Sequence, residues 1–126
     1  RTFGMISVLP GFSGHVPEGL KRVFPGVNFT RAAQWNNFGT EYSNGYLLEP
    51  TDPLFGDLAS KFYQILQSVY ETDHVYNVDT YNEMEPSSTD LNFLKESNAA
   101  IYNAMKRNDP NATFLMQGWL FRDERA

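Results

Sequence analysis

The sequence predicts an α/β fold in which helices connect neighbouring parallel strands. Three stretches have the apolar content of buried strands, at residues 3–9, 75–78 and 113–117. Two stretches between them, after Asp52 and after Asp90, carry apolar residues at helical spacing. Because strands that alternate with helices form βαβ units with right-handed crossovers, we expect a parallel sheet.

Two architectures fit this order of elements. It suits part of a (β/α) barrel, and it also suits a small doubly wound sheet, which would be complete in 126 residues. No strand is followed by a glycine-rich phosphate loop, which weakens the nucleotide-binding form of the doubly wound alternative.

The first predicted strand runs from Phe3 to Leu9, and Pro10 and Gly11 end it. A loop then leads to Pro17, which can occupy the first turn of a short helix over residues 18–24. Pro25-Gly26 ends this helix.

Residues 28–46 form a long predicted loop that is rich in aromatic side chains. Long loops in compact domains are more often functional than accidental, so we single out Trp35 as a candidate binding residue. The alternative is that these aromatics cover one end of a barrel. The loop also contains the glycosylation sequon Asn28-Phe29-Thr30, which we favour over a second sequon at Asn111 because Asn111 stands at the entry to a strand.

Both predicted helices have clear boundaries. Asp52 is the expected N-cap of the first, and Pro53 is its first helical residue. The second follows Asp90 and ends at Asp109-Pro110. Leu47 and Leu48 form a short extended piece ahead of the first helix. The expected inner faces are Leu54, Leu58, Phe62, Leu66 and Val69 in the first helix, and Leu91, Leu94, Ile101 and Met105 in the second.

The strongest catalytic candidate is Glu83, which follows Asn82 after the predicted strand at residues 75–78. Active sites of (β/α) barrels lie at the carboxyl ends of the strands. A carboxyl group there can exchange a proton with a glycosidic oxygen, while an adjacent amide binds a sugar hydroxyl. The pair of residues is a weak motif by itself.

The composition excludes several kinds of partner. The net charge is -5 with a pI near 4.9, and no basic patch is available to neutralise nucleic-acid phosphates. No apolar run is long enough to span a bilayer. The chain lacks cysteine, and its isolated histidines, His15 and His74, are expected to be hydrogen-bonded residues, so we expect no metal and no cofactor. Because the chain does not start with Met and stops abruptly after an aromatic cluster, we expect a piece of a longer protein.

A set of motifs resembles one glycosidase family along almost the full length of the chain. The resemblance is to the lysosomal-type α-N-acetylglucosaminidases, and the motifs occur in the same order as in that family: Gly14-His15-Val16-Pro17, Arg22-Val23-Phe24-Pro25, Thr72-Asp73-His74-Val75-Tyr76, Asp79-Thr80-Tyr81-Asn82-Glu83-Met84 and Gln117-Gly118-Trp119-Leu120-Phe121. If the resemblance holds, residues 1–126 are a partial catalytic domain covering about strands 3 to 5 of a (β/α)8 TIM-type barrel.

The resemblance also implies a function. The family consists of retaining exo-glycosidases that remove terminal non-reducing α-linked N-acetyl-D-glucosamine from heparan sulfate. It implies that Glu83 is the general acid/base, and that Asn82, Trp35 and Trp119 bind the substrate. It further implies a glycan partner, a lysosomal or secreted location and a need for the rest of the barrel, so we expect residues 1–126 alone to be inactive. A homo-oligomer is possible.

Two departures from the family pattern concern the loop at residues 42–46 and Glu85. Animal members often carry cysteines in that loop, whereas this chain has none. Glu85 is an acid where we expect a neutral polar residue; we expect it to point into solvent, although a charge near Glu83 would raise that group's pKa.

A retaining mechanism needs a second carboxylate about 5–5.5 Å from the first. Asp79 stands four residues before Glu83. In an extended strand that spacing gives about 13 Å, so we expect Asp79 to be a structural, inward-facing group. The family's nucleophile is a glutamate on a later strand, outside this chain. Two alternatives remain: another retaining glycosidase of the same barrel clan, and a non-catalytic sugar-binding relative.

Overall fold

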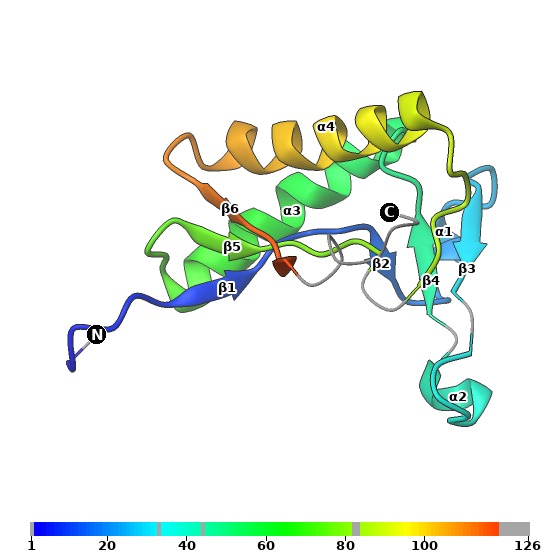
Figure 1. Cartoon of the computed structure of the whole chain (residues 1–126), viewed down its shortest axis with the longest axis horizontal. Helices are drawn as coiled ribbons and strands as arrows, with labels where there is room; N and C mark the ends of the chain where they lie inside the picture. Colours follow the sequence, from blue (N-terminus) through cyan, green and yellow to red (C-terminus); the bar gives the residue numbers. More distant parts are fainter. Residues whose placement is uncertain (1, 33, 44, 82–83, 119–126) are drawn as a thin grey trace.

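The computed structural model describes residues 2–32, 34–43, 45–81 and 84–118. Its centre is a three-stranded parallel sheet of β1 (Val8–Pro10), β5 (Val75–Asn77) and β6 (Thr113–Leu115), in the order β1-β5-β6. Leu9 is paired with Tyr76, and Tyr76 with Phe114 (Figure 1). The predicted parallel sheet with helical crossovers is therefore confirmed.

Two long helices make the crossovers, and they pack against each other. α3 (Pro53–Tyr70) connects the β1 side to β5, and α4 (Leu91–Asn108) connects β5 to β6 (Figure 1). The side chain of Asp52 accepts a hydrogen bond from the Leu54 N–H at 2.8 Å, which confirms the predicted cap. Asp90 caps α4 through the backbone N–H groups of residues 92 and 93.

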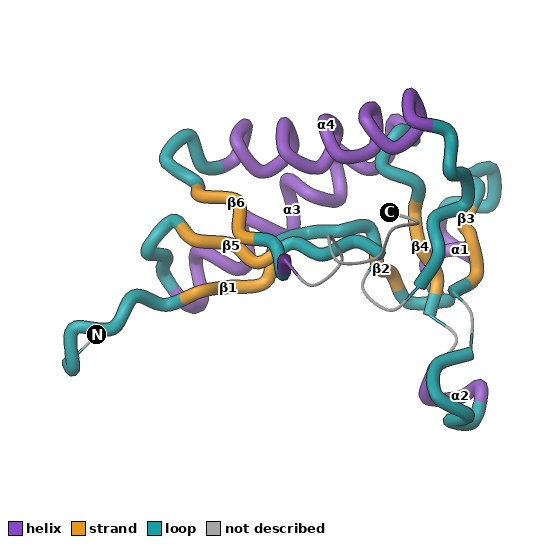
Figure 2. Tube along the Cα trace, viewed as in Figure 1, coloured by secondary structure: helices purple, strands orange, loops and turns teal. Residues whose placement is uncertain are grey.

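The chain between β1 and α3 forms a second, antiparallel sheet, of which only the extended piece at Leu47 and Leu48 was expected. It contains β2 (His15–Val16), β3 (Phe29–Arg31) and β4 (Tyr46–Leu48), in the order β2-β4-β3. The short helices α1 (Leu20–Val23) and α2 (Thr40–Ser43) belong to the same region. Figure 2 shows that loops connect most of these pieces. Part of the predicted aromatic loop is therefore strand and helix.

The core joins both sheets to the helices. Its largest fully buried side chains include Tyr63 of α3, Tyr76 of β5 and Leu48 of β4. The rings of Tyr63 and Tyr76 meet edge to face, with centroids 5.3 Å apart. The most buried residues of α3 are Phe55, Ala59, Tyr63 and Leu66. The buried face of α3 is therefore shifted by about one residue from the predicted face, and the two share Leu66.

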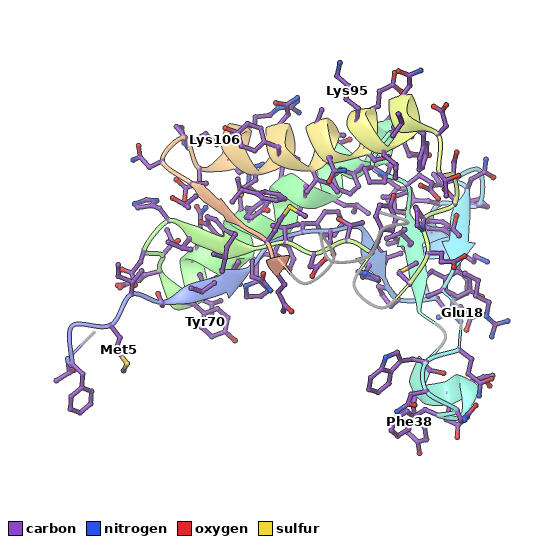
Figure 3. All side chains as sticks on the ribbon, viewed as in Figure 1. Met5, Glu18, Phe38, Tyr70, Lys95 and Lys106 are labelled. Atoms are coloured by element: carbon purple, nitrogen blue, oxygen red, sulfur yellow. The ribbon has the colours of Figure 1, made fainter. Side chains whose placement is uncertain are left out.

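Three expectations about apolar residues were wrong. The first strand starts at Val8 rather than at Phe3, and Phe3, Met5 and Ile6 are 66–85% exposed, because no described strand pairs with residues 3–7. Figure 3 shows Met5 on the N-terminal segment, away from the helices. Val69 and Leu91 are also exposed, because each lies in a terminal turn of its helix, beyond the packed central turns.

Candidate active site at the carboxyl ends of the parallel strands

The loops after β1 and β5 leave the same edge of the sheet, because these neighbouring strands are parallel. The loop after β1 contains the antiparallel sheet and Trp35, and the loop after β5 contains the Asn82-Glu83 motif. Carboxyl-end loops form the active sites of (β/α) barrels. Asn82, Glu83 and Trp119 themselves lie outside the described residues.

The chain on either side of the Asn82-Glu83 motif is held by hydrogen bonds. Gly11 N–H donates to the carbonyl of Asn77 at 2.9 Å, and Val78 N–H donates to the carbonyl of Leu115 at 3.0 Å. Further along, His15 Nε2 is 3.2 Å from the carbonyl oxygen of Thr80. The residues that flank the motif are joined to each other, because the N–H of residue 84 donates to the carbonyl of residue 81 at 3.2 Å.

Two polar side chains at the carboxyl end of β5 have a buried oxygen atom without a hydrogen-bond partner in the described part of the chain. Tyr76 and Val78 face the core, so the alternation of an extended strand directs Asn77 and Asp79 to the opposite side. The Oδ1 atom of Asn77 and the Oδ2 atom of Asp79 are both buried and have no hydrogen-bond partner among these residues. Burial raises the pKa of Asp79, which favours its neutral form. The position of Asp79 agrees with the predicted inward-facing group.

A second buried polar group lies beside the motif. Tyr81 and Ser97 have buried hydroxyl oxygens, and Glu49 has a buried Oε2, none with a hydrogen bond of regular geometry within the described ranges. Burial raises the pKa of Tyr81, the neighbouring Ser97 hydroxyl lowers it, and the charge of Glu49 raises it. The other oxygen of Glu49 accepts a hydrogen bond from the Thr30 hydroxyl at 2.6 Å. Glu49 thus lies between the antiparallel sheet and the loop after β5.

Trp35 lies in a turn that carries a pair of stacked aromatic rings. Its ring is 5.3 Å from that of Phe38, and the two planes differ by 4°. The connecting residues, Asn36 and Asn37, have positive φ values of 45° and 61°, a conformation that asparagine tolerates better than most residues. Trp35 and Phe38 are 48% and 47% exposed. One face of the indole is thus covered by Phe38, and Phe38 lies with α2 on a segment that projects from the rest of the molecule (Figures 1 and 3).

Glu85 is exposed, as expected. Asn28 is exposed and accessible, but it immediately precedes β3 and so also stands at the entry to a strand. Asn111 is likewise exposed, between α4 and β6, so the expected difference between the two sequons was wrong.

The opposite edge of the sheet contains a buried carboxylate that is hydrogen-bonded to a half-exposed histidine. Asp109 is 4% exposed and accepts hydrogen bonds from the Tyr76 hydroxyl at 2.7 Å and from His74 Nδ1 at 2.8 Å. Both histidines are therefore hydrogen-bonded, as predicted. The importance of Asp109 was missed, because in the sequence it reads only as the end of a helix.

The described residues contain neither a membrane-spanning helix nor a cluster of metal ligands. None of the described helices is long and apolar enough to cross a membrane. No group of three or more histidine, cysteine, aspartate or glutamate side chains in the same part of the chain is arranged to hold a metal ion.

The parallel sheet with its helical crossovers fits both a barrel fragment and a doubly wound sheet, and the similarity to known proteins identifies it as part of a TIM-type barrel domain. A family 89 glycoside hydrolase from Clostridium perfringens, in complex with 2-acetamido-1,2-dideoxynojirmycin, matches 98% of this chain with a TM-score of 0.81 at 23% identity. The same organism's enzyme in complex with its substrate GlcNAc-alpha-1,4-galactose matches 96% with a TM-score of 0.80 at 22% identity. The chain covers 14% of each of these structures.

The sequence comparisons assign the family. The model of the alpha-N-acetylglucosaminidase (NAGLU) tim-barrel domain matches residues 1–126. Human alpha-N-acetylglucosaminidase is 46% identical over 124 residues, which are 98% of this chain and 17% of the human protein. The chain therefore belongs to the alpha-N-acetylglucosaminidase family, and it spans about a sixth of the length of that relative.

Proposed function

We propose that the complete protein carrying this sequence is a retaining exo-glycosidase that hydrolyses terminal α-linked N-acetyl-D-glucosamine from heparan sulfate-type glycans. The 46% identity to human alpha-N-acetylglucosaminidase over nearly the whole chain carries this proposal. The Clostridium perfringens structure with GlcNAc-alpha-1,4-galactose supports the sugar and its α-linkage, because it has the same fold in this region.

In this proposal Glu83 is the general acid/base. It protonates the glycosidic oxygen as the sugar leaves, and then takes a proton from the water that hydrolyses the glycosyl-enzyme intermediate. The nucleophilic carboxylate comes from a later strand of the barrel. Asn82 binds a sugar hydroxyl, and Trp35 and Trp119 pack against the apolar face of the ring. Residues 1–126 supply about strands 3 to 5 of the barrel.

Further proposals concern the cellular context. We place the protein in the lysosome or outside the cell, with N-glycosylation at Asn28, whose exposure ahead of β3 supports this site. A glycan with terminal N-acetylglucosamine is the partner, the remaining barrel is needed to complete the site, and a homo-oligomer is compatible with this function.

The test uses the full-length protein and the substitution Glu83→Gln. With an α-linked disaccharide, whose leaving group must be protonated, kcat should fall by about 10²–10⁴-fold. An aryl glycoside with an activated leaving group should show a smaller loss in its first step. Glu85→Gln is the matched control, since Glu85 is an exposed carboxylate in the same loop, and it should retain wild-type rates within about threefold.

The other possible results of this test point to a different function or to a different role for Glu83. Activity on β-linked aryl glycosides, without activity on α-linked N-acetylglucosaminides, would identify another retaining glycosidase of the same barrel clan. Sugar binding without turnover would identify a non-catalytic relative. An active wild type with an unaffected Glu83→Gln variant would retain the glycosidase and refute the role of Glu83.

A further inference from the structure

We propose that His15 is a positioning residue, which holds the backbone of Thr80, three residues before the proposed acid Glu83. This inference rests on the proposed function, because it concerns the placement of the proposed acid. The contact joins His15 Nε2 to the Thr80 carbonyl oxygen over 3.2 Å, and it links two segments that are 65 residues apart.

The His15 backbone is fixed by the buried strand β4. His15 is paired with Leu47, and the N–H of Leu48 donates to the carbonyl of Gly14 at 2.8 Å. Gly14 has a φ of 97°, and a Cβ at this position would lie 2.5 Å from the Leu48 carbonyl oxygen. Leu47 and Leu48 are 1% and 0% exposed. The imidazole therefore extends from a part of the molecule that is held by both hydrogen bonds and packing.

The accepting group is equally well defined. Thr80 is 6% exposed, and a carbonyl oxygen can only accept a hydrogen bond, so His15 Nε2 must carry the proton. Both the Nε2–H tautomer and the imidazolium form satisfy this requirement. The contact needs only an N–H group of the His15 side chain that donates a hydrogen bond to the Thr80 carbonyl oxygen.

The contact matters because Thr80 stands where the chain leaves the sheet, shortly before the proposed acid. Up to Val78 the chain is held inside the sheet, by Gly11 on the β1 side and by Leu115 on the β6 side. Beyond Val78 it leaves the sheet, and the His15 contact ties it to the loop after β1, three residues before Glu83. A carboxyl group that must meet a glycosidic oxygen is sensitive to its support, because a displacement of about 1 Å can cost on the order of 10²-fold in rate.

Loss of this contact should therefore affect proton transfer more than sugar binding. In full-length His15→Ala, we expect kcat on an α-linked disaccharide to fall by about 10–100-fold, with KM within about threefold of wild type. The kcat/KM of an aryl glycoside reports only the first step, which needs little protonation with this leaving group, and should fall by less than about threefold. His15→Gln places an amide donor near the same position and should recover at least part of the loss.

The matched control is His74→Gln, because His74 stands at the other end of β5 and pairs with Asp109. It should lower stability without changing the ratio of disaccharide to aryl-glycoside rates. Equal losses of kcat/KM on both substrates in His15→Ala, or the same change of the kcat/KM ratio in His74→Gln, would overturn the proposal.

Amide hydrogen exchange tests the positioning role of His15 without measuring enzyme activity. In His15→Ala, the amides of residues 78–85 should exchange faster than in wild type, while those of residues 109–113 should not change. Unchanged exchange at residues 78–85 would refute the positioning role even if the enzyme is active. A wild type without glycosidase activity, combined with faster exchange in the variant, would refute the proposed function but retain the contact as the support of this segment.

Discussion

Replacement of Asp109 by alanine should destabilise the protein by about 1–4 kcal/mol. The carboxylate is 4% exposed and lies between α4 and β6, where it accepts hydrogen bonds from Tyr76, from His74 and, at 3.2 Å, from the N–H of Asn111. Tyr76 is 0% exposed, so alanine at position 109 would leave its hydroxyl proton without this acceptor in the core.

The magnitude follows from the burial of each partner. A buried donor without an acceptor costs about 1–3 kcal/mol. The His74 side chain is 47% exposed, so solvent screens its ion pair and its loss adds at most about 1 kcal/mol. His74→Ala should therefore cost far less than Asp109→Ala, whereas a fully buried ion pair would make the two losses similar.

Denaturant unfolding of the full-length protein measures this difference, with hydrogen exchange at residues 109–115 to locate it. Asp57→Ala is the control, since Asp57 is an exposed acid on α3 and its removal should change the free energy of unfolding by less than about 0.5 kcal/mol. An Asp109→Ala variant within that range, or a His74→Ala variant with an equal loss, would refute the reasoning.

The Asp109 carboxylate should also make the stability of the protein depend on pH. Burial by itself would raise the pKa of Asp109, but the hydrogen bonds from His74 and Tyr76 lower it below its ordinary value. Because the folded-state pKa lies below the unfolded one, near 3.9, the ionised carboxylate stabilises the protein above about pH 4 and this contribution is lost as the pH falls through the folded pKa. The difference in stability between wild type and Asp109→Asn should therefore be largest at pH 5–7 and shrink below about pH 4.

Three further predictions concern other parts of the molecule. Phe38→Ala removes the ring stacked on Trp35 and should raise KM about 2–10-fold, whereas Phe38→Tyr and Tyr42→Ala should not; kinetics on the full-length enzyme would contradict this if all three behaved alike. Gly11→Ala should cost about 1–3 kcal/mol of unfolding free energy, because its Cβ would lie within van der Waals overlap of Val78, whereas Gly26→Ala, in open space, should be nearly neutral. Residues 1–126 made alone should be inactive and aggregate, because a partial barrel exposes strand edges and apolar surface; a compact monomer with cooperative unfolding, by size exclusion and circular dichroism, would contradict this.

The polar contacts at both ends of the parallel strands join residues that are distant in sequence. His15 and Thr80 are 65 residues apart, and His74 and Asp109 are 35 apart. No local pattern identifies such partners, so the sequence predicted that both histidines are hydrogen-bonded but not to what. The motif signal led to Asn82, Glu83 and Trp119, whose placement the described residues do not include, so their roles stay predictions.

The sequence by itself determined the two long helices, their aspartate caps and the parallel strands that they connect. These features depend on neighbours within a few residues: the spacing of apolar side chains, an acceptor for free N–H groups and a proline in the first turn. Only the tertiary structure decided the antiparallel β2-β4-β3 sheet, the stack of Trp35 on Phe38 and the burial of Asp109. The strands of this sheet are about as short as β1, β5 and β6, but apart from Leu47-Leu48 no run of apolar residues marks them in the sequence. They are stable only because distant segments supply their hydrogen bonds and cover their side chains.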